Sequence, residues 1–259
     1  MRIVIPSYKR HTEINNKSIR VIIEAGYLYS DIDVFVANEE EYQKYKSVLH
    51  PEITIIIGKK GLKEIREFIF NYYKEGQKLL CLDDDIEMIK MKHPDDSIKS
   101  CFDNSFLNLK NEIKKGFDEC EISGKHLWGL YPVDNHYFMK NKISYDYKFI
   151  IGNFFGVILH KEANLLSVGQ IDDYERSIRH YLLDGGVVRL NYLCAKTKFL
   201  KNKGGANAEE FERDRRMKED QQLLCKKYKN LVYLKTKKDG LNPVLRDTRD
   251  IIHPLIFYK

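Results

Sequence analysis

Three successive carboxylates give the strongest chemical signal in this sequence. Asp83, Asp84 and Asp85 directly follow Leu79–Leu82, an apolar run typical of a buried strand. Alternate residues of an extended chain point the same way, so Asp83 and Asp85 are expected to share a site while Asp84 points elsewhere. Neighbouring carboxylates repel one another, and a cation relieves that repulsion. Oxygen ligands favour Mg²⁺ or Mn²⁺, bound jointly with substrate phosphates. The alternative is a solvated acidic turn that caps a helix.

The first half of the chain alternates apolar runs of strand length with segments of helical periodicity. Such alternation predicts βαβ units and a parallel sheet that is covered on both faces. The second half is more mixed, and it shows no internal repeat. The expected strands are residues 1–6, 31–37, 53–58, 79–85, 126–132, 149–160 and 187–199, and the expected helices are residues 12–26, 61–73, 104–120, 173–183 and 209–228.

Polar residues gather at three of these expected strand ends. The first strand is followed by Ser7–Arg10, the second by Asn38 and Glu39, and the fourth by the three aspartates. Because ligands of open α/β sheets bind at the carboxyl ends of the strands, these side chains are expected to line one site.

The length allows one large α/β domain or two small ones, and the pattern of strands and helices along the chain favours a single mixed α/β domain. The 259 residues are 43% apolar, enough for a sizeable core, and we divide them into a first half, 1–95, and a second half, 96–259. No apolar run approaches the length of a membrane span, and the apolar start is too short for a signal peptide. Five scattered cysteines favour a reducing compartment. We therefore expect a cytoplasmic protein with no membrane partner.

Positive charge is concentrated in the last quarter of the chain. Residues 196–259 hold 17 Lys and Arg against 9 Asp and Glu, although the whole chain carries only +6. Such a surface can neutralise phosphates, and Lys201, Lys203, Arg213 and Arg216 are the candidate contacts to nucleic acid. Acidic residues are interleaved with them, so a solvated helix face with i,i+4 ion pairs is the alternative.

The order of three motifs resembles the nucleotide-sugar domain of GT-A glycosyltransferases over residues 1–90. The motifs are IPSYKR at the N-terminus, G-x-x-x-x-R from Gly61 to Arg66, and LLCLDDDIEMI. The resemblance implies a Rossmann-like mixed sheet flanked by helices, with Mn²⁺ or Mg²⁺ on the donor diphosphate. It implies that Asp85 holds the metal and that Asp83 lies between metal and ribose. The donor residues it implies are Pro6, Ser7, Tyr8, Arg10, Asn38, Glu39, Arg66, Asp83 and Asp84.

Two features of the second half are also similar to this family. Asp172 and Asp173 match an acidic pair that opens a helix below the acceptor site of many inverting members, where one carboxylate is the general base. We favour Asp173 as the base; the alternative is that the pair only caps the helix, because Asp is a preferred N-cap. His253 matches a late histidine that completes the metal shell in several families, although a lone histidine is more often structural.

The overall motif pattern, with a late NKGG segment, resembles the TET/JBP-associated glycosyltransferases, which include phage enzymes that modify DNA. This resemblance implies a UDP-sugar donor, with glucose expected, and double-stranded DNA as acceptor. The acceptor group would be a hydroxymethylated pyrimidine such as hydroxymethylcytosine, or one that is already glycosylated, and transfer would invert configuration. The compartment would be the host cytoplasm if a phage encodes the chain.

Three other functions remain open on the sequence. The acceptor could instead be a glycan, a lipid or a protein. A nucleotidyltransferase also places acids after a strand to bind metal and phosphates, but no Gly-rich phosphate loop lies near the first strand. A non-catalytic DNA-binding module would leave Asp83 and Asp85 unexplained.

Overall fold

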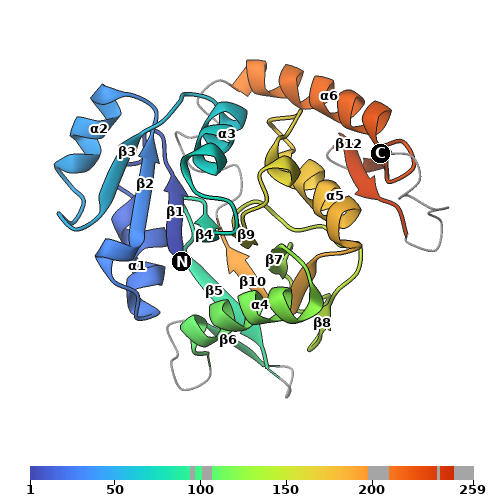
Figure 1. The fold of residues 1–259 in the computed structure, drawn as a ribbon, viewed down its shortest axis with the longest axis horizontal. Coiled ribbons are helices and arrows are strands. Elements are labelled where there is room, and N and C mark those ends of the chain that lie inside the picture. Colours follow the sequence, from blue (N-terminus) through green and yellow to red (C-terminus); the bar gives the residue numbers. More distant parts are fainter. Residues whose placement is uncertain (94–96, 101–106, 198–209, 238–239, 248–259) are drawn as a thin grey trace.

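The computed structural model describes residues 1–93, 97–100, 107–197, 210–237 and 240–247 (Figure 1). Its centre is one mixed sheet with the order β3-β2-β1-β4-β9-β7-β10-β5-β6, in which β8 also pairs with β10. The strands are β1 Arg2–Pro6, β2 Ile32–Val36, β3 Thr54–Ile57, β4 Lys78–Leu82, β5 Met88–Lys92, β6 Ile98–Ser100, β7 Leu127–Tyr131, β8 Ile143–Ser144, β9 Phe154–Ile158, β10 Val188–Lys196, and, in a separate hairpin, β11 Val232–Lys237 and β12 Gly240–Leu245.

The parallel sheet that the sequence predicts is confirmed for the first four strands and for the pair β7 and β10, whereas the other pairings are antiparallel. β1 pairs in parallel with β2 and with β4, so that Ile3 lies opposite Ile32 on one side and Leu80 on the other. β9 then runs antiparallel to both β4 and β7. Helical crossovers produce parallel neighbours, whereas β9 follows β8 without an intervening α-helix and enters the sheet in the opposite direction.

Helices cover both faces of the sheet (Figure 1). Alternate residues of β1 enter different cores: Ile3 and Ile5 pack with α1, α2 and α4, whereas Val4 packs with α3 on the other face. This burial on both faces explains the unbroken apolar runs of β1 and β4. The helices are α1 Ser18–Glu24, α2 Glu39–Lys46, α3 Leu62–Tyr72, α4 Leu109–Ser123, α5 Asp172–Asp184 and α6 Glu210–Lys227, with short 3₁₀ turns at Ile14–Asn16, Tyr29–Asp31 and Glu162–Asn164.

The predicted fold class, a mixed α/β sheet flanked by helices, is confirmed, and several element boundaries differ from the predictions. The helix expected over 12–26 is split into a 3₁₀ turn and α1, because Lys17 between them has φ −121° and ψ −107°. The strand expected over 149–160 is formed only in its second part, as β9. No helix within the described ranges has the length and apolar character required to cross a bilayer.

A third apolar cluster joins α5, α6 and the β11–β12 hairpin at one end of the molecule, where Figure 1 shows α6 and the hairpin beside α5. The side chain of Glu175 on α5 is completely buried and accepts hydrogen bonds from Ser167, Lys227 Nζ and Tyr228 Oη. The C-terminal elements are therefore fixed to the helix that begins with Asp172 and Asp173.

Candidate active site

A cavity of about 810 Å³ opens at the carboxyl ends of β1 and β4. Both halves of the chain line it, because α3 and the strand ends contribute from the first half and α5, α6 and β12 contribute from the second. Eight residues predicted to bind donor or metal line this cavity: Pro6, Ser7, Tyr8, Arg10, Arg66, Asp83, Asp84 and Asp85.

Two predicted donor residues, both in the described part of the chain, do not line the cavity. Asn38 is the N-cap of α2, and its side-chain oxygen accepts a hydrogen bond from the Glu41 amide at 3.0 Å. Glu39 accepts from Gln43 Nε2 one turn further along α2. Their neighbour Ala37 does reach the cavity wall.

The three aspartates are held by two arginines from other elements. Arg10, in the loop after β1, donates to Asp84 Oδ1 at 2.5 Å and lies 3.1 Å from Asp85 Oδ2. Arg66 on α3 donates to Asp83 Oδ1 at 3.0 Å. The sequence predicted that Asp83 and Asp85 share a site while Asp84 points elsewhere. The contacts differ from this prediction, because Arg10 contacts both Asp84 and Asp85. The reason is that β4 ends at Leu82, so strand alternation does not extend through the aspartates.

Burial shifts the pKa values of the charged groups in this cluster. Burial, opposed by Arg66 and reinforced by the neighbouring aspartates, raises the pKa of Asp83 to about 7. Burial also raises the pKa of Asp84, although Arg10 and Ser7 both favour its charged form. Burial alone would lower the pKa of Arg10, but the carboxylates around it raise that pKa. The arginines therefore offset only part of the negative charge at the strand end.

Ser18 on α1 holds the turn that carries the aspartates. Its buried hydroxyl donates to the Asp83 carbonyl at 2.5 Å and accepts from the Ile86 amide at 2.9 Å. The Asp83 amide donates in turn to the Asn153 carbonyl, just before β9, at 2.9 Å. The position of the aspartates is thus fixed by α1 and by the segment that leads into the neighbouring strand β9. The sequence carries no local signal for the role of Ser18.

The second acidic pair forms the opposite wall of the cavity. Asp172 is buried and pairs with Arg176, one turn later in α5, whose side chain is completely buried. Arg66 Nε lies 3.7 Å from Asp172 Oδ2, so Arg66 lies between Asp83 and Asp172. The guanidinium of Arg176 also lies 4.1 Å from the ring centre of Phe155. Asp172 is therefore a counter-ion for two buried arginines.

Asp173 lines the same cavity, and within the described part of the chain no arginine forms an ion pair with it. Its carboxylate accepts from the amides of Tyr174 at 2.9 Å and Gly152 at 3.3 Å. Burial, followed by repulsion from Asp172, raises the pKa of Asp173 to about 7. The alternative that the pair only caps the helix is wrong, because the N-cap of α5 is Ile171, whose side chain forms no capping hydrogen bond. Asp173 thus has the environment of a proton acceptor that works near neutral pH.

Two carboxylates fix the loop before α5. The amides of Gly169 and Gln170 donate to Asp220 Oδ2 on α6 at 2.9 and 2.7 Å. Glu175 holds the amides of Ser167 and Val168 in the same way. The C-terminal helix therefore positions the acidic pair, a role that sequence patterns do not reveal.

Several residues of the cavity wall were not predicted. Lys59, Lys60 and Asn153 join the strand-end groups, and Lys60 Nζ lies 5.9 Å from the centre of the Tyr8 ring. The adjacent lysines follow β3, so the rule that polar residues gather at strand ends could have found them. Gly61, which was predicted within a motif, has φ +115° and precedes α3, a backbone conformation that favours glycine.

The remaining predicted residues fall in different places. Arg216 on α6 lines the cavity, so the structure places this expected DNA contact beside the donor residues. Arg213 belongs to α6, but the position of its side chain is not described. Lys201, Lys203 and His253 lie outside the described residues.

The carboxylates of the cavity fit a divalent cation that also binds substrate phosphates. Within the described ranges, no group of three or more His, Cys, Asp and Glu side chains could hold a metal ion without other ligands. Mg²⁺ and Mn²⁺ in phosphate-transfer sites commonly take one or two protein carboxylates and complete their shell with phosphate and water. Asp83, with 40% of its side chain exposed, and Asp85, with 15%, can supply those oxygens.

Comparison with solved structures identifies the fold. No protein-family model matches the sequence, and no curated protein matches it. S. aureus TarS 1-349 in complex with UDP-GlcNAc superposes with a TM-score of 0.52 at 11% identity, over 87% of this chain and 67% of that one. The mannosyltransferase PcManGT from Pyrobaculum calidifontis, in complex with GDP-Man and Mn²⁺, gives a TM-score of 0.47 at 10% identity, over 73% and 53%.

The match to TarS confirms the GT-A fold that the motifs predicted. Another TarS 1-349 structure aligns over 58% of its own length, so the chain spans about half to two thirds of these neighbours.

Proposed function

We propose that this protein is a metal-dependent glycosyltransferase that uses a nucleoside-diphosphate sugar. The observation that carries the proposal is the meeting of two acidic groups in one cavity: the strand-end aspartates on one wall and Asp173 on the other. The fold shared with a UDP-GlcNAc-bound protein supports it. A nucleotidyltransferase would explain the strand-end aspartates but gives no role to a buried carboxylate with a raised pKa on α5.

The strand-end wall is suited to the donor. Asp83 and Asp85 would hold Mn²⁺ or Mg²⁺, which when bound neutralises the diphosphate and stabilises it as leaving group. Lys59, Lys60 and Arg216 add positive charge to the cavity wall, and Tyr8 offers an aromatic face. Arg10 and Arg66 keep the three aspartates in place when the site is loaded.

The α5 wall is suited to the acceptor. Asp173 accepts the proton of the acceptor hydroxyl as the oxygen bonds to the anomeric carbon and the bond from that carbon to the diphosphate breaks. Direct attack inverts the configuration. Asp172 is the poorer candidate for the base, because its carboxylate is already paired with Arg176 and lies 3.7 Å from Arg66, whereas the hydrogen bonds that Asp173 accepts within the described residues come from amides.

For the donor and acceptor we propose UDP-glucose and a pyrimidine of double-stranded DNA that is hydroxymethylated or already glycosylated. The support is the motif resemblance given above together with the exposed basic residues of α6 beside the cavity, including Arg216 and Lys218. The ion pair between Arg215 and Glu219 offsets part of that charge. A glycan, lipid or protein acceptor is the alternative.

Donor binding is tested by titrating UDP into the protein with and without Mn²⁺. Asp85→Asn should remove the effect of Mn²⁺ on the affinity for UDP. The loss in metal affinity should exceed the roughly 10–100-fold that loss of an outer-sphere partner costs. Asp118→Asn, which removes a carboxylate paired with Lys114 on the surface of α4, is the control and should bind UDP and Mn²⁺ normally. An Asp85→Asn protein with an unchanged response to Mn²⁺ would exclude the proposed metal site.

The DNA acceptor is tested separately. Release of UDP from UDP-glucose should increase with duplex that contains hydroxymethylcytosine or its glycosylated form, but not with unmodified duplex. Replacing Lys201 and Lys203 by alanine should reduce the salt dependence of DNA binding by about one unit of slope per lost phosphate contact. Binding that is the same at low and physiological salt would remove the physical basis for DNA as the acceptor.

A further inference from the structure

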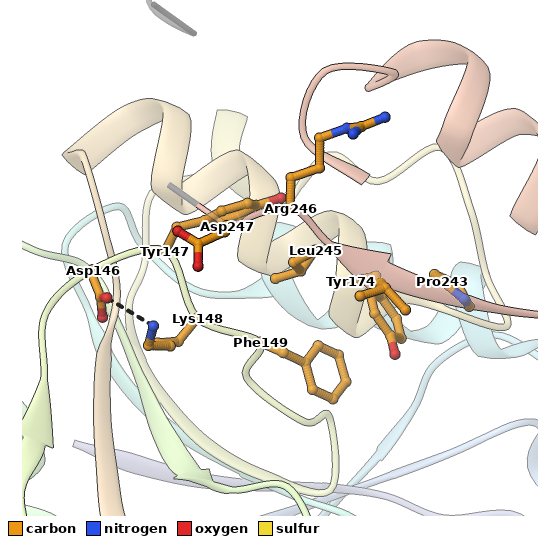
Figure 2. A pocket seen from close by; sticks show the side chains of 10 residues that line it. Asp146, Tyr147, Lys148, Phe149, Tyr174, Pro243, Leu245, Arg246 and Asp247 are labelled. Atoms are coloured by element: carbon orange, nitrogen blue, oxygen red, sulfur yellow. Dashed lines mark ion pairs between the residues drawn. The ribbon is translucent and has the colours of Figure 1, made fainter. Parts of the chain in front are cut away.

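A second pocket of about 610 Å³ adjoins the candidate active site (Figure 2). Three residues line both cavities: Phe149, Tyr174 and Pro243. The rings of Phe149 and Tyr174 lie 4.2 Å apart at an angle of 30° and form a shared aromatic wall. Tyr174 directly follows Asp173, so the second pocket begins next to the proposed base.

The aromatic wall offers a flat apolar surface at one end of this pocket. Figure 2 shows Phe149 and Tyr174 side by side there, and Asp146 with Lys148 at the other end. Both aromatic side chains are only partly buried, so part of each ring is accessible. Aromatic faces bind both planar bases and the C–H faces of sugar rings. The polar groups of the pocket therefore determine which of these ligands fits.

The polar groups facing the pocket do not favour a phosphate. Asp146 and Asp247 bring two carboxylates, and Lys148 is paired with Asp146 at 2.8 Å. Arg246 is directed away, because its Nε donates to the Lys229 carbonyl and its guanidinium lies 5.2 Å from the centre of the Tyr233 ring. Carboxylates repel a phosphodiester, whereas they accept hydrogen bonds from hydroxyl groups.

We infer that the second pocket binds a neutral sugar ring of the acceptor, stacked on Phe149 and Tyr174 and hydrogen-bonded to Asp146. This inference rests on the proposed function. The hydroxyl beside Asp173 then belongs to a sugar that is already in place. Its oxygen bonds to the anomeric carbon of the donor, its proton passes to Asp173, and the nucleoside diphosphate leaves. The enzyme therefore lengthens a saccharide and does not place the first sugar on its carrier.

The test uses the full chain and small probes that need no knowledge of the donor sugar. Saturation-transfer NMR is recorded with the methyl glycosides of glucose, galactose and N-acetylglucosamine, and with 5-hydroxymethyl-2′-deoxycytidine, in the presence of UDP and Mg²⁺. At least one glycoside should receive saturation on its ring C–H protons, and the nucleoside should not displace it. Preferential binding of the nucleoside, or no binding of any of these glycosides, overturns the inference.

Two matched aspartate variants test whether the glycoside binds in the second pocket. Asp146→Asn should weaken glycoside binding about tenfold, as expected for loss of a hydrogen bond to a charged group. Asp134→Asn is the control, because Asp134 also forms a partly exposed ion pair with a lysine, Lys90, on another part of the surface. Glycoside binding that is equal in both variants overturns the inference. If UDP binding by the unmodified protein also lacks any response to divalent metal, the proposed function itself has failed; if that response is present, only the sugar pocket is refuted.

Discussion

The two acidic groups of the cavity differ in where their counter-charges come from. Asp83, Asp84 and Asp85 are held by Arg10 and Arg66, which belong to a loop and to a helix elsewhere in the chain. Asp172 and Asp173 start a helix whose own Arg176 neutralises only the first of them. The first group shares two arginines among three carboxylates, whereas the second gives one carboxylate two arginines and the other none.

This difference separates a cation site from a proton acceptor. Three carboxylates around two shared arginines keep negative charge at the strand end, which suits a divalent cation bound with phosphates. In the second group, Arg176 is paired with Asp172, and repulsion from Asp172 makes Asp173 harder to ionise. Under the proposed function, the same residue type has three roles that depend on its surroundings: metal ligand, counter-ion and base.

The largest expected effect is loss of the base. Asp173→Asn should lower kcat by about 10²–10⁴, the usual contribution of a general base, while UDP binding is retained. Asp118→Asn on the surface of α4 is the control and should keep full activity. Steady-state UDP release with acceptor measures kcat, and NMR of the product gives its configuration. Full turnover by Asp173→Asn, or an α-linked product from an α-linked donor, would contradict the assignment.

Breaking the ion pair of the second group should chiefly affect stability. Arg176→Met leaves Asp172 buried with less compensation and should cost about 3–5 kcal/mol, seen as a loss of roughly 10 °C or more in Tm. Arg215→Met removes an exposed i,i+4 ion pair on α6 and should cost under about 1 kcal/mol. Equal melting temperatures for the two variants would show that Asp172 needs no buried partner.

The pH dependence distinguishes the base from the counter-ion. Because the pKa of Asp173 is raised to about 7 when no cation is bound, kcat/KM at saturating metal should fall about tenfold per pH unit below a pKa no higher than about 7 and level off above it. The protonated form is favoured by the fold, so the contribution of Asp173 to stability is lost as pH rises through about 7. As pH rises towards 7, kcat/KM should therefore increase while the contribution of Asp173 to the free energy of unfolding decreases. A rate that decreases between pH 6 and 8 would argue against Asp173.

The smallest expected effect concerns the turn that carries the aspartates. Ser18→Ala leaves the Ile86 amide without its hydroxyl acceptor and should cost about 1–3 kcal/mol, together with weaker UDP binding in Mn²⁺. Ser123→Ala, which removes a partly buried hydroxyl at the end of α4, should leave UDP binding unchanged. If Ser18→Ala binds UDP normally, the turn is held well enough by its contact with Asn153.

The sequence predicted much of the donor wall, because that wall consists of short segments at strand ends. Apolar runs located β1 and β4. Of the residues after them, Ser7, Tyr8, Arg10 and the three aspartates do line the cavity. Strand alternation failed beyond Leu82, because regular extended structure ends there.

The acceptor wall was predicted less completely, since it depends on contacts between distant segments. Asp220 lies about 50 residues from the amides of Gly169 and Gln170, and nothing in the local pattern of α6 indicates that contact. Arg176 is different: its i,i+4 spacing from Asp172 is visible in the sequence and could have shown that this aspartate is a counter-ion.

Arg66 gives the two walls a thermodynamic connection. One buried guanidinium touches Asp83 on the donor side and lies within 3.7 Å of Asp172 on the acceptor side, and Asp172 is the charge that opposes ionisation of Asp173. A cation bound at Asp83 would add positive charge next to Arg66 and Asp172, and it would lower the pKa of Asp173. Reciprocity of linked equilibria then requires that deprotonation of Asp173 tighten cation binding by the same factor. Cation binding on the donor side and deprotonation of Asp173 are therefore thermodynamically coupled.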